Sequence, residues 1–220
     1  MGNNLIYRFL NIKSNKMFLE DNINNESIYI DIGCNNGYTA LYALKLGAKE
    51  VFAIDANQNH VNNLKKKNFK NLTLTHKAVY LKSNDHVSLN KSIESLNDVE
   101  AYIEEGRDNQ IPTITLSDYL ESIPYDKNLI VKIDIEGSEK YISEDEFKLL
   151  AEISDKIHFA FHQHHFTDDN PYKLAFKYFR VYHSLYGYEV TDYLEIKKSN
   201  YKEVILIPKE NSWNRLLNRS

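Results

Sequence analysis

A short apolar run that enters a glycine-bearing turn and then a helical pattern constrains the fold of this chain more than any other feature. Residues 27–39 read Ser-Ile-Tyr-Ile-Asp-Ile-Gly-Cys-Asn-Asn-Gly-Tyr-Thr, and apolar residues at helical spacing follow over 38–46. Gly33 and Gly37 therefore fall where a strand ends and a helix begins. Glycine suits this place because it accepts positive φ and lets a ligand lie against bare backbone. Free amides at the helix start offer hydrogen-bond donors to an anion.

Strand and helix patterns continue to alternate after this turn. Residues 50–55 predict a second buried strand, a helix is expected over 58–68, and 72–79 predict a third strand. Such alternation favours right-handed crossovers and a parallel sheet with helices on both faces. The predicted fold class is therefore α/β.

The second half resumes this pattern after an interruption at about 82–112, where we expect an insertion that forms a hairpin or loop. Residues 128–135 form its most apolar strand pattern, and 156–161 predict another strand. The chain is then expected to close with a helix over 172–186 and an antiparallel pair of strands over 188–193 and 203–207.

One domain is expected over 27–220, because this length suffices to bury a substantial core. The preceding segment, 1–26, has a loose helical face and predicts either a helix over the sheet edge or a lid. Within the domain, 114–120 predict the start of a helix capped by Ser117.

Charge and cysteine content exclude several classes of protein. The net charge of -4 argues against a sequence-independent nucleic-acid binder. The single cysteine, Cys34, excludes an internal disulfide and a multi-cysteine zinc site, and it fits a reducing compartment. No apolar run reaches the roughly 20 residues of a membrane span. We therefore expect a cytoplasmic protein with no nucleic-acid partner and no membrane span, and a homodimer stays open.

Ligands of open α/β sheets bind beyond the carboxyl ends of the strands, so the residues there are the candidate site. Asp55 lies 22 residues after Gly33 (55 minus 33), where a carboxylate can accept both hydroxyls of a ribose. The turn lacks the second glycine of Gly-x-Gly-x-x-Gly, which favours S-adenosylmethionine over a nicotinamide dinucleotide. The predicted cofactor-binding residues are Asp31, Gly33, Cys34, Asn35, Gly37, Asp55, Ala56, Lys77 and Ala78.

Two carboxylates, Asp134 and Glu136, stand at the mouth of the strand predicted over 128–135. Alternation places both on one side if the strand persists that far. Two acids this close can raise one another's pKa, which suits a general base near neutral pH. They can also hold a divalent cation through oxygen ligands. Lys132 is expected on the same side, and its alternative role is to neutralise one acid.

Four of the eight histidines lie between His158 and His165. His158 is expected to be a packed core residue, whereas His162, His164 and His165 lie at or past the end of the strand. One of these three can deprotonate a hydroxyl. Metal ligation by two histidines with Asp134 or Glu136 is an open alternative, but no metal ligand is predicted. The predicted catalytic residues are Asp134, Glu136, His162 and His164.

Four segments carry a family resemblance: Asp31-Ile-Gly-Cys-Asn-Asn-Gly37, the strand that ends at Asp55, residues 111–118 and, most specifically, Val131-Lys-Ile-Asp-Ile-Glu-Gly-Ser-Glu139. Over roughly residues 29–166 the chain resembles the FkbM family of S-adenosylmethionine-dependent methyltransferases. The resemblance implies a Rossmann-like class I methyltransferase, with a mostly parallel seven-stranded sheet and an antiparallel final strand. It also implies methyl transfer to an oxygen of a sugar, polysaccharide or polyketide.

The chain departs from this family after the strand at 156–161. Similar proteins often carry an acid followed by a histidine there, whereas this chain has Ala160-Phe-His-Gln-His-His165. The resemblance therefore specifies the cofactor more closely than the acceptor. The first hypothesis is an S-adenosylmethionine-dependent O-methyltransferase that acts on a small-molecule or glycan acceptor. The alternatives are a nucleotide-dependent oxidoreductase on the same fold and a non-catalytic cofactor-binding module.

Overall fold

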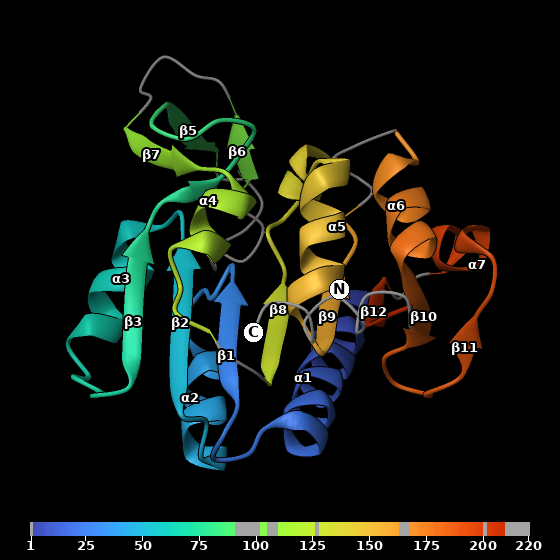
Figure 1. Ribbon diagram of the computed structural model, residues 1–220, viewed down its shortest axis with the longest axis horizontal. Helices are drawn as coiled ribbons and strands as arrows, with labels where there is room; N and C mark the ends of the chain where they lie inside the picture. The colour runs from blue at the N-terminus through green and yellow to red at the C-terminus, as the bar shows by residue number, and fades with distance from the viewer. Residues whose placement is uncertain are drawn as a thin grey trace, which may run out of the picture.

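The computed structural model describes residues 2–90, 102–104, 110–125, 128–162, 168–199 and 202–209. Its centre is an eight-stranded sheet in the order β11-β10-β12-β9-β8-β1-β2-β3 (Figure 1). The bounds of these strands are β1 Ile28–Ile32, β2 Glu50–Asp55, β3 Leu72–His76, β8 Leu129–Ile133, β9 Lys156–Ala160, β10 Phe179–His183, β11 Glu189–Val190 and β12 Glu203–Pro208.

The five central strands, from β3 through β2, β1 and β8 to β9, are parallel, and β12 runs antiparallel to β9. The α/β class and the antiparallel final strand are thus as predicted. The predicted count of seven strands was wrong by one, because the two-residue strand β11 extends the sheet beyond β10. In the central register, Asp31 lies opposite Lys132, which in turn lies opposite His158.

Helices cover both faces of this sheet (Figure 1). Ile28, Ile30 and Ile32 of β1 are buried on one face, whereas Tyr29 of the same strand belongs to the core on the other. The Tyr29 face is covered by α1 Gly2–Asn22, α2 Tyr38–Leu46 and α3 Gln58–Lys65. The other face is covered by α4 Leu116–Glu121, α5 Glu144–Ile153, α6 Asn170–Tyr178 and α7 Tyr193–Lys198.

Three local predictions were wrong. The helix predicted over 172–186 ends at Tyr178, and the next five residues form β10. The segments 188–193 and 203–207 are not paired with each other, because β10 lies between β11 and β12. Thr115, not Ser117, caps α4, since the Thr115 side chain accepts a hydrogen bond from the amide of Asp118.

A second, four-stranded sheet lies beyond the ends of β2 and β3, at the upper left of Figure 1. Its order is β4-β7-β5-β6, with β4 Ala78–Val79, β5 His86–Asn90, β6 Tyr102–Glu104 and β7 Ile111–Ile114. A small core that includes Tyr80, Val87 and Ile103 holds it together. Among the described helices, none is both long enough and apolar enough to cross a membrane.

Candidate active site

The glycine turn after β1 is packed tightly against two neighbouring segments. Gly33 has φ +82°, and a Cβ atom there would lie 1.8 Å from the backbone oxygen of Asp134. Gly37 has φ +77°, and its Cβ would lie 2.2 Å from the Leu64 side chain of α3. A side chain at either position would therefore collide with its neighbour. The absence of a Cβ at Gly33 also brings the turn against the segment that carries Asp134.

Asp55, at the end of β2, is fixed beside this turn. Its Oδ2 accepts a hydrogen bond from the Asn35 amide at 2.7 Å, and its Oδ1 accepts one from the Asn57 amide at 2.7 Å. His60 Nδ1 of α3 lies 3.3 Å from Oδ1. The carboxylate is thus held in one orientation at the carboxyl edge of the sheet. Sequence reasoning did not identify His60, although it follows Asp55 by five residues near the start of the predicted helix.

Three further predicted cofactor residues, Ala56, Lys77 and Ala78, follow the ends of β2 and β3. The Lys77 amide donates to the Asp55 carbonyl oxygen at 3.2 Å, and His76 Nε2 lies 3.0 Å from the carbonyl oxygen of Ala56. Ala78 is buried at the start of β4. The structure thus brings the ends of β2 and β3 together. These positions are compatible with the predicted cofactor residues, which stay a prediction.

Asp31 lies beneath the turn and is fully buried. Thr39 Oγ1 donates a hydrogen bond to Asp31 Oδ2 at 2.5 Å, and Lys132 Nζ lies 3.6 Å from Oδ1. Burial raises the pKa of Asp31, while Lys132 and Thr39 oppose that rise. This placement suits a residue that orients the turn. Cys34 is also buried, and burial raises the pKa of its thiol.

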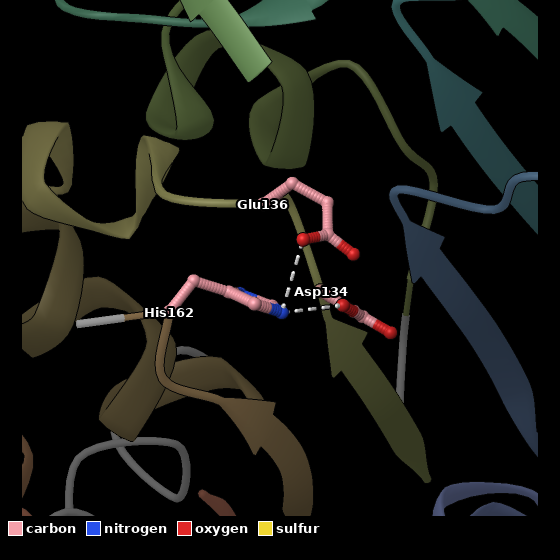
Figure 2. A group of neighbouring side chains, drawn as sticks. All are labelled: Asp134, Glu136 and His162. Atoms are coloured by element: carbon pink, nitrogen blue, oxygen red, sulfur yellow. Dashed lines mark ion pairs between the residues drawn. The ribbon is translucent and has the colours of Figure 1, made fainter. Parts of the chain in front are cut away.

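Asp134, Glu136 and His162 converge at the carboxyl ends of β8 and β9 (Figure 2). The His162 imidazole points toward both carboxylates: Nε2 lies 3.5 Å from Asp134 Oδ1 and 3.4 Å from Glu136 Oε2. Glu136 has φ +49° and Gly137 φ +95°, so a tight left-handed turn directs the Glu136 side chain. Three of the four predicted catalytic residues therefore lie together, and their catalytic role stays a prediction. His164 and His165 lie outside the described residues.

Glu139 organises this cluster, and sequence reasoning did not assign it a role. It lies in the short 3-10 helix Ser138–Tyr141 and is fully buried. Its carboxylate accepts hydrogen bonds from the amides of Ile135 and Gly137 and from His162 Nδ1 at 2.8 Å. It thereby fixes both the turn and the imidazole. The available signal was its place at the end of the segment 131–139.

The charges of this cluster are strongly coupled. Lys132 Nζ lies 3.1 Å from Asp134 Oδ2, as the neutralising alternative predicted. Burial raises the pKa of Asp134, but Lys132 and His162 outweigh burial and hold it below its ordinary value. Burial lowers the pKa of His162, but Glu139, Glu136 and Asp134 outweigh it and raise that pKa to about 10. The imidazole is therefore protonated near neutral pH when only these side chains surround it.

His158 is a core residue, as predicted. It is buried in β9, where its Nε2 lies 2.9 Å from Ser14 Oγ of α1 and 3.4 Å from Glu203 Oε2 of β12. Its partners lie on α1 and β12, and its effect on the cluster is electrostatic, since it helps to lower the pKa of Asp134. His158 is thus not a candidate catalytic residue.

Comparison with known proteins identifies the family. The family model for the methyltransferase FkbM domain matches residues 31–190, which is most of the chain and includes the glycine turn and all three converging residues. The chain belongs to the FkbM methyltransferase family. Among curated proteins, the ribosomal protein L11 methyltransferase of Thermoanaerobacter sp. strain X514 is 49% identical to this FkbM-family chain over 41 residues. That match covers 19% of this chain and 13% of the relative's length.

Solved structures are similar to this FkbM-family protein at low sequence identity. A proposed rRNA methylase from Clostridium thermocellum gives a TM-score of 0.50 at 10% identity, covering 89% of this chain and 92% of that one. A TehB-like S-adenosylmethionine-dependent methyltransferase from Corynebacterium glutamicum gives 0.47 at 10% identity, covering 94% and 97%. A Plasmodium falciparum dimethyladenosine transferase gives 0.45 at 17% identity, covering 93% of this chain and 63% of that one. The first of these, the Clostridium thermocellum structure, shows similarity of fold alone.

Proposed function

We propose that this FkbM-family protein is an S-adenosylmethionine-dependent methyltransferase that O-methylates a hydroxyl of a sugar, a polysaccharide precursor or a similar small metabolite. The observation that carries the proposal is the placement of Asp55, a fixed carboxylate beside a glycine turn at the carboxyl edge of the sheet. Asp134, Glu136 and His162 lie at the same edge, on the neighbouring side of that turn. Family membership over residues 31–190 supports the reaction class.

The donor set at this edge fits S-adenosylmethionine. Asp55 keeps acceptor capacity for the two ribose hydroxyls, because each carboxylate oxygen can accept more than one hydrogen bond. The backbone of Gly33 to Gly37 would face the methionine portion, and residues 76–78 would flank the adenine. When bound, this cofactor supplies an activated methyl group. Asp31 acts through the turn, as a positioning residue rather than a direct ligand.

The chain's own contribution to the chemistry is to position the acceptor hydroxyl and to receive its proton. Asp134 is the candidate acceptor of that proton because it is ionised near neutral pH, whereas the pKa of His162 is raised to about 10. The expected rise in the pKa of Asp134 was wrong, because Lys132 and His162 outweigh burial and lower it, and this makes Asp134 a weaker base than expected. Glu136 is the most exposed of the three, at 24%, so it is best placed to meet the hydroxyl first. His162 then fixes the two carboxylates relative to each other.

The cofactor site is tested by calorimetry with S-adenosylmethionine and its demethylated product. Asp55→Ala removes a charged acceptor, so we expect affinity to fall at least about 10-fold. Glu121→Ala, an exposed acid at the end of α4, serves as the control and is expected to bind like the wild type. Unchanged affinity in Asp55→Ala would show that the ribose site is assigned wrongly.

Two further measurements separate the alternatives. Binding of a nicotinamide dinucleotide in place of S-adenosylmethionine would favour the oxidoreductase. A methyl-transfer assay with sugars and glycan precursors separates the enzyme from a non-catalytic binding module. In that assay Asp134→Asn is expected to lower turnover by about 100-fold or more, since general base catalysis contributes roughly that much. Affinity for the cofactor is expected to change little in this variant.

A further inference from the structure

We propose that Asp134, Glu136 and His162 form a binding site for a divalent cation of the first transition row, with Mn²⁺ as its best representative. One ligand atom of each residue lies within 4.8 Å of the others. Two carboxylate oxygens and one imidazole nitrogen form the donor set. Oxygen donors alone would favour Mg²⁺ or Ca²⁺, whereas imidazole shifts the preference toward transition metals.

The spacing of these ligand atoms matches that of a metal site. With metal–ligand bonds of about 2.1 Å, two ligand atoms lie roughly 3.0 Å apart at octahedral angles and about 3.4 Å apart at tetrahedral angles. His162 Nε2 lies 3.4 Å from Glu136 Oε2 and 3.5 Å from Asp134 Oδ1. The two spacings that involve Nε2 therefore fit a shared cation, and all three ligand atoms lie within 4.8 Å of one another.

The contacts behind the imidazole provide a second, independent observation. A histidine that binds a metal through one nitrogen usually donates its other N–H to a carboxylate, which fixes the ring. His162 Nδ1 lies 2.8 Å from Glu139 Oε1, and Glu139 is itself fully buried and held by the amides of Ile135 and Gly137. This buried carboxylate directs Nε2 toward Asp134 and Glu136 (Figure 2).

The charge balance also favours a cation. The two carboxylate oxygens of Asp134 face different partners: Oδ2 faces Lys132, and Oδ1 faces His162. Besides Lys132, the cluster contains the carboxylates of Asp134, Glu136 and Glu139. A dication at Nε2 would place two positive charges, in place of the one of an imidazole proton, among the three carboxylates that face His162.

The site is also accessible. The exposed side-chain fractions are 11% for His162, 19% for Asp134 and 24% for Glu136, so a cation bound there keeps coordination positions for an oxygen from outside. If the proposed function holds, that oxygen is the acceptor hydroxyl, which the cation would orient and acidify. A hydroxyl acidified in this way would give up its proton more readily to Asp134, the acceptor proposed above.

The test measures Mn²⁺ binding to the full chain after chelator treatment, by the loss of the free Mn²⁺ signal in electron paramagnetic resonance. The wild type is expected to bind one Mn²⁺ saturably, more tightly than Mg²⁺ or Ca²⁺ in competition. Glu136→Gln and His162→Gln are expected to weaken binding at least 10-fold, and Glu139→Gln by about 10-fold through the imidazole. Glu121→Gln is the control and is expected to bind like the wild type.

Two outcomes would overturn the proposal: no saturable Mn²⁺ binding by the wild type, or equal binding by Glu136→Gln. Either would identify the cluster as an ion-pair network only. Circular dichroism reports whether each variant is folded, and Glu136→Gln carries the test if His162→Gln unfolds, because Glu136 is the most exposed ligand. Asp55→Ala is expected to bind Mn²⁺ normally while it loses S-adenosylmethionine. The metal site and the cofactor site can therefore fail separately.

Discussion

Gly33 is the residue at which the two halves of the candidate site touch. A Cβ there would lie 1.8 Å from the Asp134 backbone oxygen, in a segment with little freedom to move. Gly187 also has positive φ, at +71°, but nothing lies within 4 Å of the position of its Cβ. The two glycines therefore separate the effect of backbone conformation from the effect of close packing.

We expect Gly187→Ala to lower the free energy of unfolding by about 1–2 kcal/mol, since an L residue in the left-handed region is strained by that amount. Gly33→Ala adds overpacking of roughly 1–3 kcal/mol and is expected to lose about 2–5 kcal/mol. Urea denaturation of both variants measures the difference. Equal losses would mean that the Asp134 segment moves away readily and that the two halves of the site are not rigidly joined.

Some residues of the candidate site could be identified from the sequence, and others could not. Asp134, Glu136 and His162 were identified as candidates because parallel strands bring their carboxyl ends to one edge, whereas the convergence of their side chains could not be predicted from the sequence. Glu139 was not identified as part of it. Its hydrogen bonds depend on a turn with φ +49° at Glu136 and on a histidine 23 residues away, and neither can be read from a pattern of apolar residues.

Glu146 links the starts of two helices. Its Oε2 accepts hydrogen bonds from the amide and hydroxyl of Ser143, which complete a capping box at α5. Its Oε1 accepts a hydrogen bond from the Ser117 amide in the first turn of α4. The buried carboxylate thus satisfies donors of both helices.

Ser143→Ala is expected to lower the free energy of unfolding by about 1 kcal/mol, as for the loss of one N-cap. Glu146→Ala is expected to lose about 2–3 kcal/mol, because it leaves amides of both helices without their acceptor. Lys148→Ala, an exposed change on α5, serves as the control and should stay within about 0.5 kcal/mol of the wild type. Similar losses for Ser143→Ala and Glu146→Ala would mean that the bond to Ser117 contributes nothing.

Elements that alternate in the chain were predictable, whereas those placed by distant pairing were not. β2, Glu50–Asp55, was predicted with its observed bounds, because residues 51–54 form an apolar run that is followed by an acid. The end of α6 was missed: Tyr178 continues a helical pattern, but the residues after it form β10, which pairs between β11 and β12. This pairing depends on strands that come later in the chain, so local periodicity does not reveal it.

The sequence allows two roles for the N-terminal helix α1, a helix that packs on the domain or a separate lid. Phe18 and Leu19 of α1 are buried in the core that covers one sheet face. The Phe18 ring lies 5.3 Å from that of His158, measured between centroids, and Ser14 lies 2.9 Å from His158 Nε2. These contacts cover the buried side chains of His158 and Glu203, whose Nε2 and Oε2 atoms lie 3.4 Å apart.

We therefore expect α1 to unfold together with the sheet. Phe18→Ala should lower the free energy of unfolding by about 3–5 kcal/mol, because it leaves a cavity over this pair. Met17→Ala, at a position 36% exposed, is the neighbouring control and should change it by less than about 0.5 kcal/mol. Urea unfolding followed by far- and near-ultraviolet circular dichroism should give one coincident transition, shifted to lower urea in Phe18→Ala. A lid would behave differently: an early transition of small amplitude would separate from a main transition with an unchanged midpoint.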